Sequence, residues 1–183
     1  MNARRTRDSE RGYSLVELMA VIIIVGVLAT LATIGVRKYV FAAKSSEAIH
    51  MIGAIKAAEE AYKDETFVYL NVSTDIDSYY PTQTPNGKTK VQWGGTGGDQ
   101  PARWGQLGVS VGAPVQYGYA CVAGKAGDSV PDPGLRTNPY GAVSTTEPWY
   151  VVKAVGDMND DGVQSIFTSS SFSTEIFSQN EDE

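Results

Sequence analysis

The sequence has a single cysteine, Cys121, and a single histidine, His50, among its 183 residues. One cysteine excludes an intrachain disulfide, so a stable domain has to rely on its hydrophobic core or on some other staple. We expect Cys121 to behave as a small buried apolar residue. With so little histidine and cysteine, the chain has no zinc-ligand set and no Ser/His/Asp constellation. The sequence therefore predicts a protein that is not an enzyme.

Basic residues are scarce beyond the N-terminus. The formal net charge is −6, and removing residues 1–12, which hold four arginines and two acids, makes it −8. No run of Lys and Arg follows this leader. Because phosphate contacts need clustered basic side chains, we expect no nucleic-acid partner.

Charged residues are absent from Leu18 to Val36, where only Thr30 and Thr33 are polar. A helix of about 20 such residues can cross the hydrocarbon core of a bilayer, which is about 30 Å thick. Four arginines precede it, which predicts a cytoplasmic N-terminus and an exported C-terminal part: Arg4, Arg5, Arg7 and Arg11. No signal-peptidase-like site follows the apolar run. The one cleavage-like junction, Gly12–Tyr13, precedes it, so cutting there would keep the span.

One carboxylate, Glu17, lies at the start of this apolar segment. An acid in a membrane-centred helix costs about 3 kcal/mol, so its presence indicates a function that needs a partner. Cleavage after Gly12 would create one candidate, the free α-amino group of Tyr13. That amine could come from the same chain, one helical turn away, or from a neighbouring copy.

Residues 11–18, Arg-Gly-Tyr-Ser-Leu-Val-Glu-Leu, resemble the cleavage and N-methylation signature of type IV prepilins and type II secretion pseudopilins. The resemblance implies that Gly12 precedes the scissile bond, that Tyr13 becomes the N-methylated first residue, and that Glu17 guides subunit assembly. Tyr13 stands where phenylalanine is usual. Ile34 stands where many members have a helix-kinking proline, so the resemblance does not extend to that kink.

The same resemblance implies partners and a location. The partners are further copies and other pilin-like subunits, the inner membrane, a prepilin peptidase/methyltransferase and the pilus assembly platform. The location is the inner membrane, as a single-pass protein, and then a pilus or pseudopilus in the periplasm or at the cell surface.

The helix is expected to continue beyond the span, from about Ser14 to Asp64, because residues 37–65 contain no proline. Apolar residues recur there at spacings of three and four and form one stripe: Ala48, Ile52, Ile55, Ala58 and Tyr62. We expect the charged residues of this stretch to occupy the remaining surface. The first half is apolar all round, whereas the second half is predicted to pack on a domain.

After the helix, four segments read as strands of an antiparallel sheet: residues 115–123, 149–155, 163–168 and 174–177. Residues 71–112 read as a long irregular connection, rich in Gly and Pro. Its Trp93 and Trp104 could form a sugar-binding face, but packing onto the helix is the favoured interpretation. The fold prediction is α+β and pilin-like. Four parts are predicted: a leader (1–12), the apolar half-helix (13–36), the amphipathic half-helix (37–65) and a β domain with an acidic C-terminal tail (66–183).

One motif is typical of a metal site. Asp157, Asn159 and Asp161 fall at positions 1, 3 and 5 of a calcium-loop pattern, Gly162 at position 6 and Ser165 at position 9. Position 12 lacks the glutamate that completes an EF-hand, and an Asp/Asn/Gly-rich turn needs no metal. The loop is therefore either a Ca²⁺ site or a hydrogen-bonded turn.

The leading functional hypothesis is a structural subunit, a minor or accessory pilin-like protein of a type IV pilus or related filament. One alternative is a type II secretion pseudopilin. Another is a membrane-anchored exported binding domain that uses the aromatic residues between positions 79 and 119.

Overall fold

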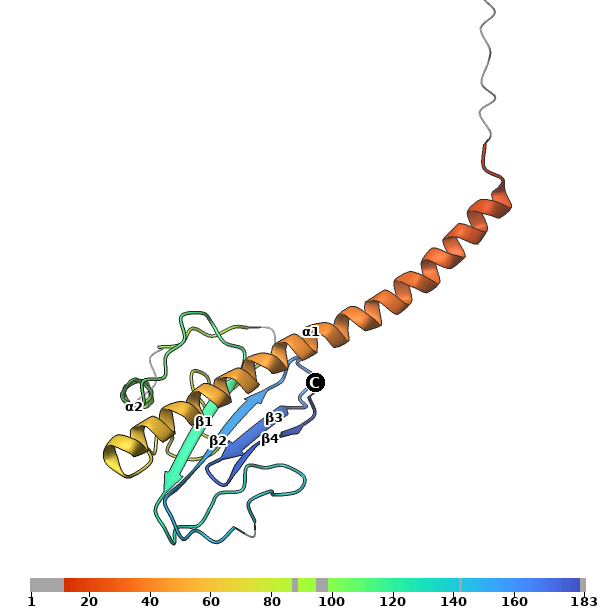
Figure 1. Ribbon diagram of the computed structural model, residues 1–183. Coiled ribbons are helices and arrows are strands. Elements are labelled where there is room, and N and C mark those ends of the chain that lie inside the picture. The colour runs from red at the N-terminus through yellow and green to blue at the C-terminus, as the bar shows by residue number, and fades with distance from the viewer. Residues whose placement is uncertain (1–11, 87–88, 95–98, 142, 182–183) are drawn as a thin grey trace, which may run out of the picture. The chain divides into compact units, whose positions relative to one another are not determined.

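The computed structural model describes residues 12–86, 89–94, 99–141 and 143–181. The leader residues 1–11 lie outside this part, and so do the predictions made on their arginines. The chain divides into two compact units, residues 1–39 and 40–183, and each is described by itself. Figure 1 shows the elements, two helices and four strands in the described residues.

Helix α1 runs from Leu15 to Thr66, 52 residues without a break. The expected helix, from about Ser14 to Asp64, agrees with it to within two residues. In the first unit its side chains are exposed along the whole apolar segment. The two hydroxyls there bond to the helix itself, because Thr30 Oγ1 and Thr33 Oγ1 donate to the carbonyls of Gly26 and Ala29, both at 2.9 Å.

In the second unit the four strands form one antiparallel sheet in the order β1-β2-β3-β4. They are β1 (Gly118–Gly124), β2 (Trp149–Gly156), β3 (Ser165–Ser170) and β4 (Ser173–Gln179). Short helix α2 (Gln100–Gln106) lies in the connection between α1 and β1. Neighbours in sequence are neighbours in the sheet, as short connections favour. The predicted α+β class and pilin-like arrangement are confirmed.

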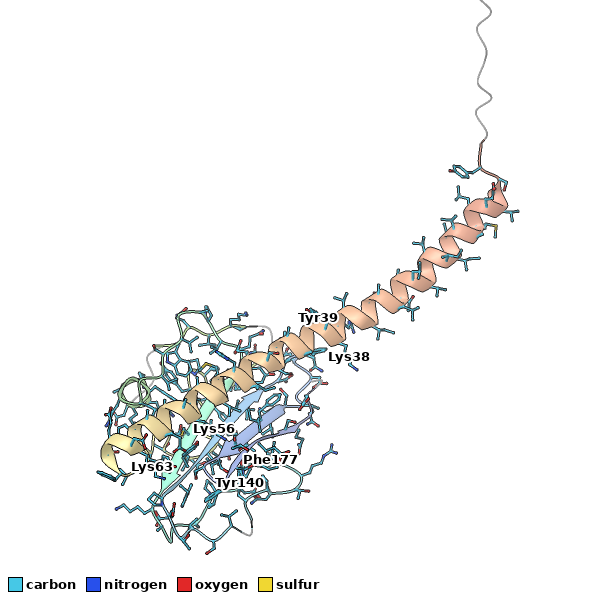
Figure 2. The ribbon with its side chains drawn as sticks, viewed as in Figure 1. Lys38, Tyr39, Lys56, Lys63, Tyr140 and Phe177 are labelled. Atoms are coloured by element: carbon cyan, nitrogen blue, oxygen red, sulfur yellow. The ribbon has the colours of Figure 1, made fainter. Side chains whose placement is uncertain are left out.

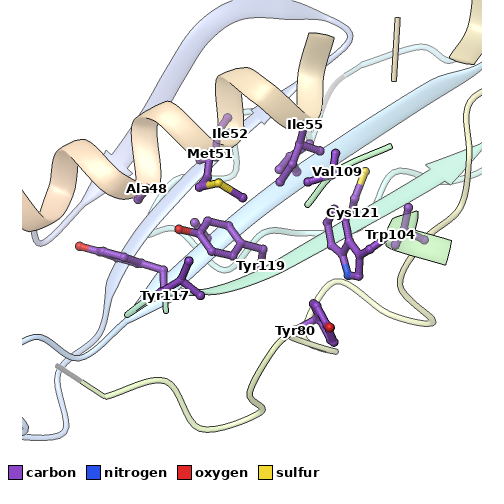
Figure 3. Close-up of a cluster of buried hydrophobic side chains, with 14 of the residues drawn as sticks. Ala48, Met51, Ile52, Ile55, Tyr80, Trp104, Val109, Tyr117, Tyr119 and Cys121 are labelled. Atoms are coloured by element: carbon purple, nitrogen blue, oxygen red, sulfur yellow. The ribbon is translucent and has the colours of Figure 1, made fainter. Parts of the chain in front are cut away.

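The second half of α1 packs on one face of this sheet. Ala48, Ile52 and Ile55 are completely buried, so the predicted apolar stripe is confirmed. Figure 3 shows these residues pointing toward Tyr119 and Cys121 of β1. Ala58 and Tyr62, further along the stripe, pack on the same core while partly exposed.

The other face of the sheet is also covered. Trp149 and Val151 point away from α1 and join a second buried cluster with Tyr140, which comes from the connection between β1 and β2. Tyr140 lies beside Phe177 of β4, with ring centroids 6.1 Å apart (Figure 2). Covering both faces explains why every residue of β2 is buried.

The charged residues of the second half of α1 do not all occupy its outer surface, so that expectation is wrong for part of the set, whereas others such as Glu60 are exposed. Five of them bond to groups of the domain instead: Lys44 to the Met158 carbonyl, Glu47 to the Gln116 amide, Lys56 to the Ser173 carbonyl, Glu59 to the Leu70 amide and Lys63 to the Tyr69 hydroxyl. Figure 2 shows Lys56 and Lys63 on this helix. Most of the bonded groups are backbone groups outside the ladder of the sheet, which need partners when they are covered.

The strand predictions were right in number and order but shifted at their ends. The third strand begins at Ser165 and not at Val163, because the turn before it extends to Gln164. It continues to Ser170, and its last three residues, Thr168 to Ser170, are fully buried. The first strand begins at Gly118, three residues later than expected.

Candidate assembly interface

The start of α1 is a capping box. Ser14 lies just before the first helical residue, and its backbone N–H and hydroxyl both donate to Glu17 Oε2 at 2.9 Å. The Glu17 N–H donates in turn to Ser14 Oγ at 3.2 Å. A serine followed three residues later by glutamate satisfies two free helix N–H groups in this way. The single chain thus gives Glu17 a local partner, Ser14, which the sequence reasoning missed although Ser-x-x-Glu is the signal for it.

Gly12 and Tyr13 precede this box in exposed, non-helical backbone. Tyr13 is 86% exposed. A non-helical and accessible Gly12–Tyr13 bond is what a protease needs at its cleavage site. The structure therefore places the residues predicted for cleavage, methylation and assembly within six positions of one another, at the entrance to α1.

The apolar segment that follows has no partner in the described structure. Helix α1 is the one described helix long and apolar enough to cross a membrane, and none of its apolar segment is buried. Leu18, Ile22 and Ile24, for example, are each nearly 60% exposed. So large an apolar surface must be covered by lipid or by other protein chains.

The outward side of α1 in the second unit is also unusual. From Ala42 to Ala57 its exposed positions carry no Asp, Glu, Lys or Arg. They are small or uncharged, and they form one side of the helix: Ala42, Ala43, Ser46, Ile49, His50, Gly53, Ala54 and Ala57. We call this set the outward face. Small residues allow another helix to approach closely.

The calcium-loop residues form a hydrogen-bonded turn. Asp157 is buried, and its Oδ1 accepts the N–H groups of Asp160 and Asp161 while its Oδ2 accepts that of Gly162. Asp161 Oδ1 accepts the Val163 N–H, and Ser165 Oγ donates to the Gly156 carbonyl.

These bonds are those of a turn that needs no metal. The carboxylates of Asp157 and Asp161 accept backbone N–H groups of the same loop. In the described part of the chain no group of three or more His, Cys, Asp and Glu side chains is placed to hold a metal ion. The arrangement fits the turn interpretation, and the calcium site stays a prediction.

The tryptophans of the long connection belong to the core. Trp104 is fully buried and Trp93 is 9% exposed, and they contact each other and Tyr80. The favoured interpretation, packing toward the helix, is therefore confirmed. Neither ring is available as a sugar-binding platform.

The chain resembles known proteins in its N-terminal motif and over longer stretches. Residues 7–33 match a family model described as the prokaryotic N-terminal methylation motif. Fimbrial protein EcpC of Eikenella corrodens is 32% identical over 128 residues, which cover 67% of this chain and 79% of that protein. The chain belongs to the type IV pilin and type II secretion pseudopilin family.

A second relative in this family is the type II secretion system core protein G of Pseudomonas aeruginosa strain PAO1. It is 32% identical over 84 residues, which cover 46% of this chain and 59% of the relative, less than two thirds of its length. No solved structure is significantly similar to the chain. The pilin-like chain is a structural subunit that assembles with other pilin subunits, and its family is structural and not enzymatic.

Proposed function

We propose that the chain is a minor or accessory subunit of a type IV pilus or a related filament. The observation that carries this proposal is the exposed apolar half of α1, most of which lies within the matched methylation motif. Such a segment is stable in two environments, a bilayer before assembly and the core of a helical filament afterwards. Both are apolar, so transfer between them costs little.

The proposed topology is single-pass, with residues 1–12 in the cytoplasm and the second unit exported. The four leader arginines favour this orientation. A prepilin peptidase cuts after Gly12 and methylates the new amine of Tyr13, and the assembly platform then extracts the subunit. The exposed Gly12–Tyr13 backbone supports the cleavage step.

In the filament, the Glu17 carboxylate pairs with the Tyr13 amine of a neighbouring subunit. The capping box keeps the carboxylate bonded to Ser14 until that amine arrives. A misplaced subunit would leave two charges unpaired in an apolar core, and a buried unpaired charge costs several kcal/mol. The pair therefore selects the correct register of subunits.

The outward face of α1 extends the contact along the same helix. Its occupant in this proposal is α1 of another pilin subunit, because the family assembles through such subunits and the face holds no charge that packing would have to desolvate. Ile49, 44% exposed, supplies the largest apolar side chain on this face.

Similarity to protein G favours a second candidate, a type II secretion pseudopilin. The absence of a disulfide is compatible with it, since many type IV pilins close their C-terminal region with one. The two candidates differ in where the assembled chain is found and in whether secretion stops when it is deleted.

The deciding experiment is mass spectrometry of material sheared from the cell surface, compared with the inner-membrane fraction. The proposal expects an N-methylated Tyr13 peptide in the sheared material, at lower abundance than the main subunit. A methylated peptide confined to the cell envelope, together with loss of secretion on deletion, would favour the pseudopilin. An intact Met1 terminus found solely in the inner membrane would refute both.

A further inference from the structure

Glu59 is the one acid of α1 that is completely buried in the second unit. Its Oε2 accepts the Leu70 N–H at 2.9 Å, and its Oε1 accepts the Cys121 thiol at 3.2 Å. The carboxyl group therefore joins three segments: the helix, the chain that leaves the helix, and strand β1. A lone carboxylate in such a place is costly unless a cation or a proton neutralises it.

Residues 70–73 form a strap along the outer edge of β1. Ser73 donates its N–H to the Cys121 carbonyl at 2.8 Å, and its Oγ accepts the Cys121 N–H at 3.2 Å. Asn71 Oδ1 accepts the Ala123 N–H at 3.1 Å. The strap thus occupies backbone groups of an edge strand that would otherwise be open for pairing with another chain.

No described cation compensates Glu59. On its own helix, Lys56 donates to Ser169 and Ser173, Lys63 donates to Tyr69, and Glu60 adds negative charge. From the other elements, Cys121 of β1 is the described titratable group that bonds to Glu59, whereas Tyr150 of β2 and Tyr69 beside the strap interact with Glu60, and none of the three is a cation.

Burial therefore raises the pKa of Glu59 from 4.5 to about 7, although the Leu70 and Cys121 hydrogen bonds oppose the rise. When the strap is open and Glu59 is in water, its pKa returns to the ordinary value. At pH values between about 4.5 and 7, Glu59 is protonated when the strap is closed and ionised when the strap is open. Raising the pH through this window consequently favours the open form.

We propose that residues 70–73 act as a pH-controlled cover of β1, seated while Glu59 carries a proton and released when it loses that proton. Release frees the backbone groups of Cys121 and Ala123 along the outer edge of the sheet. Release also exposes the Cys121 thiol, which is the only thiol in the chain and is completely buried when the strap is closed.

Cys121 makes the proposal measurable in the full chain, held in detergent micelles. The rate of alkylation by iodoacetamide is divided by the rate for the same chain unfolded in urea at the same pH, which removes the pH dependence of the thiol itself. With closed and open pKa values of about 7 and 4.5, the ratio should rise about 30-fold from pH 5.5 to pH 8.5.

Two matched variants test whether Glu59 causes the rise of the alkylation ratio with pH. Glu59→Gln keeps an amide oxygen that can accept from Leu70 but has no proton to lose, so its ratio should be flat with pH. Glu65→Gln changes an exposed acid on the same helix and should retain the wild-type rise. If Glu59→Gln fails to fold, the wild-type profile still decides, because a flat profile overturns the proposal.

A third measurement separates the strap from unfolding of the whole unit. Opening of the strap exposes Val72 and Ser73, which are completely buried, but far less surface than unfolding of the whole unit, so urea should accelerate labelling much less steeply than it promotes unfolding of the unit. An acceleration as steep as that of whole-unit unfolding would overturn the strap as the moving element. Retention of the full pH rise in Glu59→Gln would overturn Glu59 as the group that controls it.

Discussion

Placing an arginine at Gly53 should stabilise the monomer and prevent its assembly. Gly53 lies in the middle of the outward face, and a Cβ atom built there meets no heavy atom within 4 Å. The change in monomer stability is then set mainly by helix propensity. Replacing glycine by arginine inside a helix gains about 0.8 kcal/mol, which corresponds to an increase in Tm of about 3 °C for a unit of this size.

Assembly should respond in the opposite direction. If α1 of another subunit covers the outward face, a guanidinium at position 53 must be desolvated without a partner. A penalty of about 3 kcal/mol, modest for a buried unpaired charge, reduces incorporation about 100-fold. The assay is quantitative immunoblotting of the sheared filament fraction against the inner-membrane fraction, combined with thermal unfolding of the purified chain in detergent.

The matched control is Glu65→Arg, which puts the same side chain on the same helix beyond the outward face. It should assemble normally. Normal incorporation of Gly53→Arg together with a raised Tm would refute packing on this face. A lowered Tm would refute the description of Gly53 as an open position.

Three further predictions address other parts of the molecule. Glu17→Ala should leave the amount of membrane-bound protein unchanged and abolish its incorporation into filaments. Ser14→Ala, which removes the capping hydroxyl and keeps the Glu17 carboxylate, should still be incorporated. Equal loss of incorporation in both variants would mean that the cap alone matters. Calcium at 1 mM should leave Tm unchanged in wild type and in Asp157→Asn, because the Asp157 carboxylate already holds the loop closed through backbone N–H groups without a metal. A rise confined to wild type would establish the calcium site instead. Gly124→Ala should lower the free energy of unfolding by about 1–2 kcal/mol, since the new Cβ would lie 2.6 Å from Trp149 Cε2 in a packed core and overpacking outweighs the gain in chain entropy. Gly112→Ala, with open space around it, is the control and should be neutral or stabilising.

The fold was predictable to the extent that it depends on periodicity. The spacing of Ala48, Ile52 and Ile55 identified the buried side of α1, because one side of a helix repeats every three to four residues whatever it packs against. The last residues of β3 were not predictable. Ser169 and Ser170 are polar and yet fully buried, held by local bonds such as the one from Ser169 Oγ to the Glu175 carbonyl, and no pattern in the sequence reveals that environment.

The site was predictable where a motif is local and not where it depends on the fold. Gly12, Tyr13 and Glu17 follow one another in a short signature, so the sequence was sufficient to propose them. The inward direction of Glu59 and Lys56 was missed, because charged side chains on an amphipathic helix usually face water. Their partners, the Leu70 amide and the Ser173 carbonyl, come from distant segments whose positions the sequence does not specify.

Residues near the start of the second unit are bonded to residues far along the described chain. Ser45 Oγ donates to the Glu181 carbonyl, 136 positions away, and Lys44 Nζ donates to the Met158 carbonyl. A ribosome delivers the N-terminal partner of each pair long before the C-terminal one. These bonds therefore cannot form until Met158 and Glu181 have been synthesised, and contacts of such long range form slowly. In the proposed topology, a polypeptide that stays open for this long can cross the membrane unfolded, and it needs protection from aggregation until these later residues arrive.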